Sequence, residues 1–123
     1  MAKVVIDANV FVSAAFGGVP LDAVSKAFST GEVFLSPAVI EEIDGTIRRL
    51  SSKMGEEKTG YLLKLWRRFQ SHCTIHLCIA AKADFLVTGD KDLLAVDPGS
   101  VAVLPDTLKI VTPKQFLEGG LEN

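Results

Sequence analysis

The stretch Phe85-Leu86-Val87-Thr88-Gly89-Asp90-Lys91-Asp92 decides the expected fold class. Its first three residues are apolar and predict a buried strand, and the turn behind them carries two acidic side chains. The chain opens in a similar way, because Val4-Val5-Ile6 is followed by Asp7 and Asn9. Open α/β sheets bind their ligands outside the carboxyl ends of their strands. The two stretches therefore predict that acidic side chains meet at one edge of a parallel sheet.

The composition is typical of one globular domain. The chain has 123 residues, of which 48% are hydrophobic and 23% charged, and we expect a single domain over residues 1–123. No segment approaches the ~20 apolar residues that cross a bilayer. The first residues begin a strand and not a signal peptide. These features predict a soluble, cytoplasmic protein that makes no contact with a membrane.

The cysteines and histidines do not have the spacing of a zinc site. Cys73 and Cys78 fall outside the C-x-x-C pattern. On a helix their spacing places them on different faces, so we expect packed thiols and no disulfide. His72 and His76 would share a helix face, and we expect surface or packing roles for both.

Strands and helices alternate along the chain. Strands are expected over residues 3–6, 33–35, 85–88 and 109–111, and helices over 20–31, 37–50, 56–69 and 113–117, with a helical turn over 91–95. Ser36 and Pro37 suit the N-cap and the first position of the second helix, which should end before a polar break at 51–55. Such alternation predicts an α/β fold with a parallel sheet covered on both faces.

Residues 71–84 are ambiguous. Ile75, Leu77 and Ile79 alternate with polar residues, which is strand periodicity. The run Ile79-Ala80-Ala81-Lys82-Ala83 instead favours a helix by propensity. A parallel strand at 85–88 also needs a long crossover before it, which is usually helical. We therefore favour a helix, although the pattern leaves residues 71–79 open between helix and strand.

The helix predicted after residue 36 offers a third acid for the sheet edge. Successive residues of a helix lie ~100° apart, which centres its apolar stripe between Ile43 and Ile47. Glu41 falls nearly opposite this stripe, whereas Glu42 and Asp44 fall on its two flanks. The latter two are the candidates to point into a cleft.

Each strand-end acid also has a structural interpretation. Asp7 would be a capping or turn acid, with Asn9 making an Asx turn, and Asp90 and Asp92 would be the N-cap of the helical turn that follows and its neighbour. The functional interpretation is a carboxylate cluster, whose hard oxygen ligands suit Mg²⁺ or Mn²⁺. With no P-loop and no nucleophilic serine or cysteine beside the acids, the cluster indicates hydrolysis by a metal-bound water.

The basic residues are concentrated in one part of the chain, although the net charge is −2. Seven of the thirteen lysines and arginines lie within one span, namely Arg48, Arg49, Lys53, Lys58, Lys64, Arg67 and Arg68. A basic helical pair beside an acidic centre would bind the phosphates of RNA, and Arg48, Arg49, Lys53, Arg67 and Arg68 are the candidate contacts. The alternative is a solvated helix face.

These motifs resemble the PIN domain family (PilT N-terminus domains), in particular VapC-like toxins, over most of the chain. Val5-Ile6-Asp7-Ala8-Asn9-Val10 is similar to the family's opening strand, and Ser36-Pro37-Ala38-Val39-Ile40-Glu41-Glu42-Ile43 to its second motif, which selects Glu42. The stretch from Ala83 to Leu94 resembles the last acidic motif and is the most specific signal. The segment from Ile110 to Leu117 resembles the family's ending.

The resemblance implies a three-layer α/β/α sandwich with a central, mostly parallel sheet. It implies an Mg²⁺- or Mn²⁺-dependent endoribonuclease, the toxin of a toxin–antitoxin pair, that forms a homodimer and binds an antitoxin protein. The residues it assigns are Asp7, Glu42 and Asp90 as metal ligands and catalytic acids, Asp92 as a further catalytic acid, and Asn9 and Thr88 in support.

The chain departs from the family pattern at one acid. The family places an Asp at the start of the helix before the Ala-Asp-strand segment, and that position falls here at Ser71. No Asp or Glu occurs between Glu57 and Asp84, and the chain is short in this region. The alternative prediction is therefore a catalytically degenerate PIN domain that binds RNA or protein. A phosphohydrolase with Asp7 as nucleophile is disfavoured, because Asn9 stands where such enzymes need a second Asp.

Overall fold

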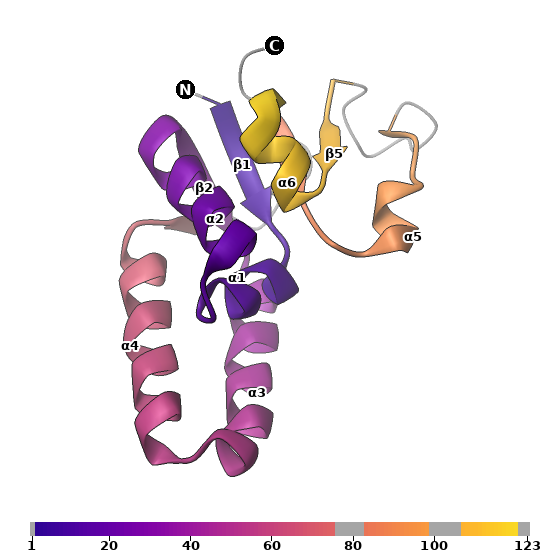
Figure 1. The fold of residues 1–123 in the computed structure, drawn as a ribbon. Helices are drawn as coiled ribbons and strands as arrows, with labels where there is room; N and C mark the ends of the chain where they lie inside the picture. The colour runs from indigo at the N-terminus through magenta and orange to yellow at the C-terminus, as the bar shows by residue number, and fades with distance from the viewer. Residues whose placement is uncertain (1, 76–82, 99–106, 121–123) are drawn as a thin grey trace.

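The computed structural model describes residues 2–75, 83–98 and 107–120. Figure 1 shows the arrangement of the elements within these ranges. In chain order they are β1 (Ala2–Ile6), α1 (Ala8–Ala14), α2 (Gly18–Thr30), β2 (Gly31–Leu35), α3 (Pro37–Met54), α4 (Glu56–Ser71), β3 (Thr74–Ile75), β4 (Phe85–Val87), α5 (Lys91–Leu94), β5 (Lys109–Val111) and α6 (Pro113–Gln115), which a wider helical turn over Phe116–Gly120 continues.

The strands form one parallel sheet in the order β3-β2-β1-β4-β5. All four neighbouring pairs are parallel. Lateral rows of side chains cross the sheet, since Val4 of β1 lies opposite Val33 of β2 and Phe85 of β4. These three side chains are at most 5% exposed. The expected α/β class with a parallel sheet is confirmed.

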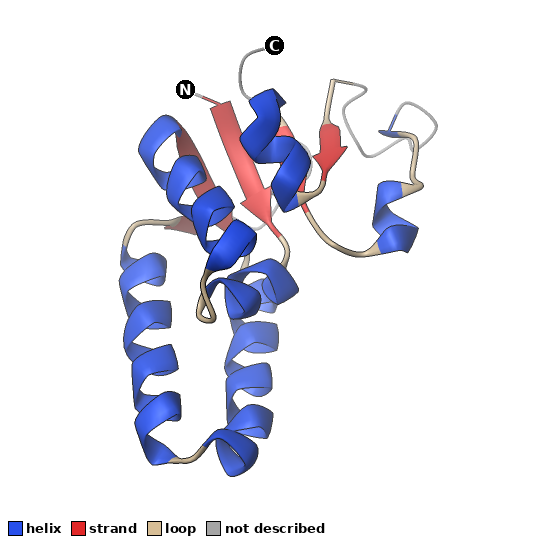
Figure 2. Ribbon diagram, viewed as in Figure 1, coloured by secondary structure: helices blue, strands red, loops and turns tan. Residues whose placement is uncertain are grey.

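Helices α2 and α6 lie side by side over one face of the sheet (Figure 2). Helix α2 buries Ala23, Val24 and Ala27 against the apolar row of the strands. The Lys26 ammonium donates to the Phe116 carbonyl at 3.0 Å and lies 5.5 Å from the centre of the Phe116 ring. These contacts hold the helical turn over Phe116–Gly120 against α2.

Local signals explain where the later helices begin. The Ser36 hydroxyl accepts from the Val39 amide at 3.2 Å, and Pro37 takes the first helical position of α3, as the sequence predicts. Thr112 and Gln115 form a reciprocal capping box at α6. The polar break expected at 51–55 is wrong for residues 51–54, which continue α3, with Ser52 and Lys53 exposed and Met54 packed against the core. Only Gly55, with φ of +83°, separates α3 from α4.

Helix α1 is absent from the expected elements. It begins directly after Asp7 and buries Ala8, Val10, Phe11 and Ala14. A helix that is apolar on most sides has no alternation of apolar and polar faces, so the periodicity that reveals an amphipathic helix is missing. Its burial between the sheet and the long helices explains both its composition and the failure to predict it.

The preference for a helix over residues 71–84 is wrong at Thr74 and Ile75. These two residues form β3 and pair in parallel with Phe34 and Leu35 at the end of β2. The open edge of β2 offers backbone partners that outweigh helical propensity. Residues 76–82, which include the helical run from Ile79 to Lys82, His76 and Cys78, lie outside the described residues.

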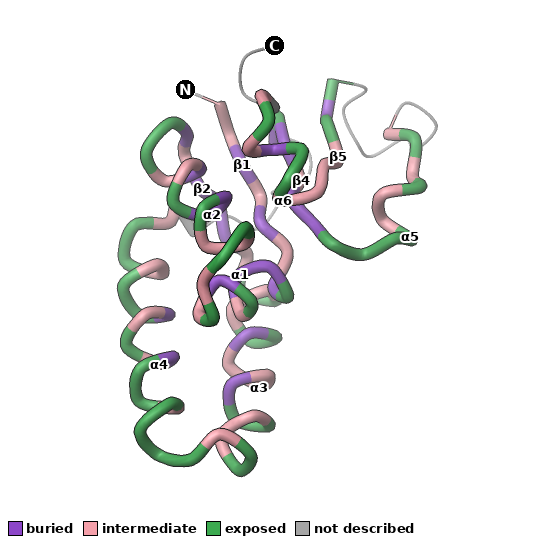
Figure 3. Tube along the Cα trace, viewed as in Figure 1, coloured by how far each residue is buried: buried purple, intermediate pink, exposed green. Residues whose placement is uncertain are grey.

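Helices α3 and α4 form a hairpin that extends beyond the carboxyl ends of the strands (Figure 1). Their outer faces are exposed, whereas a buried stripe on each faces α1 (Figure 3). The Phe11 ring of α1 packs edge-on against Trp66 of α4, with 5.8 Å between ring centres. The Trp66 indole nitrogen donates to Asp44 Oδ1 of α3 at 2.8 Å.

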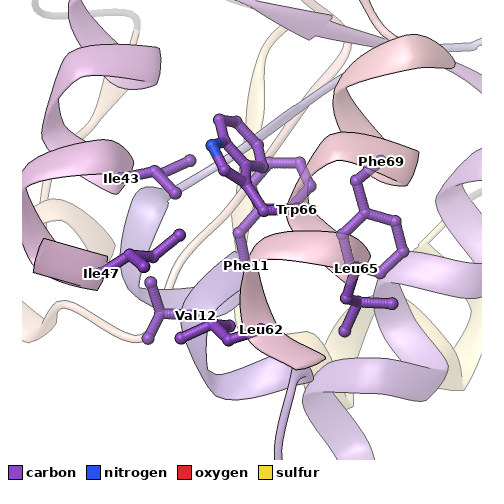
Figure 4. A pocket seen from close by; sticks show the side chains of 8 residues that line it. All are labelled: Phe11, Val12, Ile43, Ile47, Leu62, Leu65, Trp66 and Phe69. Atoms are coloured by element: carbon purple, nitrogen blue, oxygen red, sulfur yellow. The ribbon is translucent and has the colours of Figure 1, made fainter. Parts of the chain in front are cut away.

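The contact between α1, α3 and α4 is closely packed. Figure 4 shows the eight apolar and aromatic side chains that converge there, namely Phe11, Val12, Ile43, Ile47, Leu62, Leu65, Trp66 and Phe69. The space left between them is ≈ 10 Å³, about the volume that one water molecule needs. This region is therefore a core and not a ligand site. No single described helix is long and apolar enough to span a membrane, although α1 and α2, bent by 110°, reach that length together.

Candidate metal site at the carboxyl edge of the sheet

Asp7 stands where β1 ends and α1 begins. Its amide donates to the Val87 carbonyl of β4 at 2.9 Å, and its carbonyl accepts from Val10 at 3.0 Å. Its carboxylate makes no cap on α1, so the capping part of its structural interpretation is wrong, whereas its carbonyl does begin a turn. The carboxylate instead turns to the neighbouring strand, where Oδ2 accepts from the Thr88 hydroxyl at 2.7 Å.

Thr88 connects the two acidic stretches. Its side chain is fully buried, and it is the one buried polar side chain in the part of the chain that the structure describes. The hydroxyl donates to Asp7 Oδ2 and accepts from the Asp90 amide at 3.1 Å. The Thr88 amide donates to Val111 of β5 at 2.9 Å. A buried hydroxyl with both its donor and its acceptor in use fixes the positions of its two partners.

Asp90 caps the short helix α5. Its Oδ1 accepts from the Asp92 amide at 2.8 Å, which confirms the N-cap interpretation. Asp90 and Asp92 are both exposed. One carboxylate oxygen of Asp90 thus accepts the capping hydrogen bond, and one carboxylate oxygen of Asp7 accepts the hydrogen bond from Thr88. Each carboxylate thus keeps a second oxygen with no hydrogen bond to another described residue.

The acids and the amide that the sequence adds to this pair have different surroundings in the described structure. Glu42 is exposed on α3, and Asp44 accepts from Trp66, which gives it a packing role between the two long helices. Within residues 2–75, 83–98 and 107–120, no group of three or more His, Cys, Asp or Glu side chains is placed to hold a metal ion. Asn9 is exposed on α1. Thr88 therefore joins the Asp7 and Asp90 stretches, and no hydrogen bond among the described residues joins the Glu42 carboxylate to either acid.

Ser71 is the last residue of α4. It is exposed, and its hydroxyl donates to the Arg68 carbonyl of the same helix at 2.7 Å. The chain passes from Ser71 into β3, which the strands β2 and β1 separate from β4. Three strand spacings amount to about 14 Å. The position at which the family would place its acid is therefore remote from Asp90 in this fold.

Asp84 also lies away from the candidate site, at the amino end of β4. Its carboxylate accepts from the Lys3 amide at 2.7 Å, and its own amide donates to the Lys3 carbonyl at 2.7 Å. The Asp84 carbonyl accepts from Lys109 at 3.0 Å. These bonds join β1, β4 and β5, so Asp84 stabilises the sheet and does not replace a missing ligand.

The candidate RNA contacts are exposed on the helical hairpin. Arg48, Arg49 and Lys53 lie on α3, and Arg67 and Arg68 on α4. Arg49 Nη2 donates to the Thr46 hydroxyl at 2.9 Å, one turn earlier on the same helix. Solvent exposure suits both interpretations of these cations, as a phosphate-binding surface and as a solvated face.

Cys73 and His72 have packing roles. The Cys73 Sγ donates to the Phe69 carbonyl at 3.1 Å, and burial raises the pKa of this thiol from 9.0 to about 12. It is a free cysteine. His72 is exposed, and its ring contacts Phe28 edge-on at 6.3 Å between ring centres. The expectation of packed or surface residues holds for these two.

Comparison with known proteins identifies no relative: no family model, no curated protein and no solved structure matches this chain.

Proposed function

We propose that this chain is a PIN-like domain of three α/β/α layers that hydrolyses RNA phosphodiesters with the help of Mg²⁺ or Mn²⁺. The observation that carries the proposal is the pair Asp7 and Asp90, which adjacent strands supply and which Thr88 links. Both acids lie at the carboxyl edge of a parallel sheet, where α/β folds bind their ligands. Each has an oxygen that no described residue occupies, and carboxylate oxygens are the ligands that these ions prefer.

The chain's own residues orient the site. Thr88 holds the Asp7 carboxylate at the end of β1, and the α5 cap holds the Asp90 carboxylate at the end of β4. Glu42 and Asp92 are the further acids that the family resemblance assigns. A bound Mg²⁺ or Mn²⁺ would supply Lewis-acid polarisation of a phosphoryl oxygen and a lowered pKa for a water. The cations of α3 and α4 would bind the flanking phosphates.

The biological setting follows from the resemblance. A VapC-like chain would be the toxin of a toxin–antitoxin pair, would form a homodimer in the cytoplasm, and would be inhibited by an antitoxin protein. The substrate would be RNA, with a partly single-stranded target that leaves the phosphodiester accessible.

A second candidate function is binding without cleavage. It is favoured by Ser71, which stands in place of the family's acid, and by the lack of a group of three or more metal-ligating side chains among the described residues. Fewer carboxylates mean a weaker attraction for a divalent cation. In this case the domain would bind RNA or a protein partner through α3 and α4 alone.

The test combines Mn²⁺ titration with cleavage of single-stranded RNA. The variants are Asp7→Asn and Asp90→Asn, and the matched control is Asp22→Asn, which changes an exposed acid on α2. We expect each site variant to weaken Mn²⁺ binding by about tenfold or more and to slow cleavage by about a hundredfold, since one charged ligand is lost. The control should behave like the wild type.

Two results would decide against catalysis. If the wild type binds RNA but leaves it uncut in Mn²⁺, the binding module is the better description. If the wild type cuts RNA and Asp7→Asn cuts equally fast, the activity belongs to another site or to a contaminant.

A further inference from the structure

Two aromatic side chains are unusually exposed near the free end of the helical hairpin. Phe16 is 66% exposed and Tyr61 is 60% exposed, whereas the other described phenylalanines and Trp66 are at least partly buried. Phe16 lies in the turn between α1 and α2, where its amide donates to the Ser13 carbonyl at 3.0 Å. The next residue, Gly17, has φ of +83°. Phe16 therefore ends the last turn of α1, directly before the chain reverses into α2.

The two rings line one small pocket. Its lining comes from the end of α1 and from the two long helices, namely Ala15, Phe16, Met54, Lys58, Tyr61 and Leu62. The pocket has a volume of ≈ 190 Å³. This is well above the roughly 10–15 Å³ that one water molecule needs and below the ~300 Å³ at which sites for drug-sized ligands begin. It suits a single planar ring system.

The pocket has one cation in its lining and belongs to a helical hairpin with an excess of positive charge. Lys58 belongs to its lining, and residues 48–71 carry seven cationic side chains against two acidic ones, Glu56 and Glu57, neither of which lines the pocket. The cations of this span are all exposed. A ligand that joins a flat apolar ring to negative charges would match both features. An unpaired nucleotide of RNA has this combination.

We propose that this pocket binds an unstacked base of single-stranded RNA, with Phe16 and Tyr61 as stacking partners and Lys58 beside the adjoining phosphate. The inference rests on the proposed function for its substrate class. Helix α1, seven residues and so about 10 Å long, leads from Asp7 to this pocket. One strand of RNA can therefore reach both places.

The chemistry of the pocket also predicts its selectivity. Besides Lys58, its lining side chains are apolar or aromatic except for the Tyr61 hydroxyl, so few groups can read the hydrogen-bonding edge of a base. Stacking accepts every base because each has a π face. The pocket should hold the strand in place and contribute little sequence preference.

Binding of a fluorescently labelled single-stranded RNA, measured by anisotropy in EDTA, tests the inference apart from catalysis. Tyr61→Leu keeps an apolar side chain but removes the ring, and Tyr61→Phe keeps the ring. We expect Tyr61→Leu and Phe16→Leu each to weaken binding by about tenfold, within the range measured for loss of one stacking ring. Tyr61→Phe should stay within about twofold, and the salt dependence should be unchanged because no charge is altered.

Val19→Ala is the matched control, since Val19 is exposed by 43% but does not line the pocket. The inference would be overturned if Tyr61→Leu and Phe16→Leu bind RNA as tightly as the wild type does. It would also be overturned if the wild type does not bind RNA. A change in self-association with unchanged RNA affinity would assign the pocket to a protein contact and would also overturn it. Failure of the proposed catalysis has a different signature, because uncut RNA in Mn²⁺ leaves the binding result in EDTA unaffected.

Discussion

The turn after β4 and the junction after α4 both contain a hydroxyl side chain, and the two hydroxyls have different roles. Thr88 is fully buried between two strands, donates to Asp7 and accepts from the Asp90 amide. Ser71 is exposed at a helix end and donates to the carbonyl of Arg68 in its own helix. The first hydroxyl joins two acids that are distant in sequence, whereas the second satisfies one backbone group.

The difference follows from position in the sheet. Strands β1 and β4 are adjacent central strands, so the ends of both lie within hydrogen-bonding distance of Thr88. Junction residues 71–73 lead to β3 at the sheet's edge, where one neighbouring strand is present. Central strand ends can therefore gather acids from several loops, and an edge junction cannot.

The thiol at the edge junction should be unreactive. Burial raises the pKa of Cys73 to about 12, so little thiolate forms near neutral pH. In a Cys78→Ser background, alkylation by iodoacetamide at about pH 8 should be roughly a hundredfold slower for the native chain than for the chain unfolded in guanidinium. Equal rates would show that the junction is open to solvent.

The same burial predicts a loss of stability in alkali. The folded chain holds the Cys73 proton more tightly than the unfolded chain, whose thiol titrates near 9.0. Below pH 9 the thiol is protonated in both states, so the free energy of unfolding does not depend on its titration. From pH 9 towards about 12 the unfolded chain loses this proton first, and the free energy of unfolding falls. Denaturant midpoints measured across this range should decline less in Cys73→Ala than in the wild type.

Thr88→Val should break the central network. The substitution keeps the shape of the side chain but leaves Asp7 without its donor and the Asp90 amide without its acceptor. The free energy of unfolding should fall by about 1–3 kcal/mol in urea denaturation. Thr88→Ser, which keeps the hydroxyl and loses one buried methyl, should cost about 1 kcal/mol. Equal stabilities of the Val and Ser variants would contradict the role given to the hydroxyl.

Asp90 and Asp92 should differ although they are two residues apart. Asp90→Ala removes the cap of α5 and should lower the free energy of unfolding by about 1 kcal/mol. Asp92 contributes its backbone amide to that cap, so Asp92→Ala should change stability by less than about 0.5 kcal/mol. The reverse order would mean that the Asp92 carboxylate, and not Asp90, organises the turn.

Ser71→Asp should have the smallest effect. A carboxylate at the edge of the sheet, about 14 Å from β4, lies beyond the screening length of physiological salt. The affinity for Mn²⁺, measured by calorimetry, should stay within about twofold of the wild type. A tenfold gain would place residue 71 beside Asp7 and Asp90 and would restore the family's ligand set.

The sequence alone determined the local features. Apolar runs predicted β1, β2, β4 and β5, since buried parallel strands read as continuous hydrophobic segments. Ser36 and Pro37 located the start of α3, because capping depends on neighbouring residues only. The acids at the ends of two strands also followed from the sequence, and with them the expectation that they would share an edge of the sheet.

Other features required the tertiary structure. Helix α1 and strand β3 exist because of what surrounds them, and their residues carry weak or contrary local signals. Glu42 and Asp44 flank the same apolar stripe, and only the packing of Trp66 decides that Asp44 is a structural partner. Thr88 meets Asp7 across 81 residues of sequence. A chain's propensities act over a few residues, whereas the sheet decides which distant side chains become neighbours. For this reason the sequence predicted the acids of the candidate site but not the contacts between them.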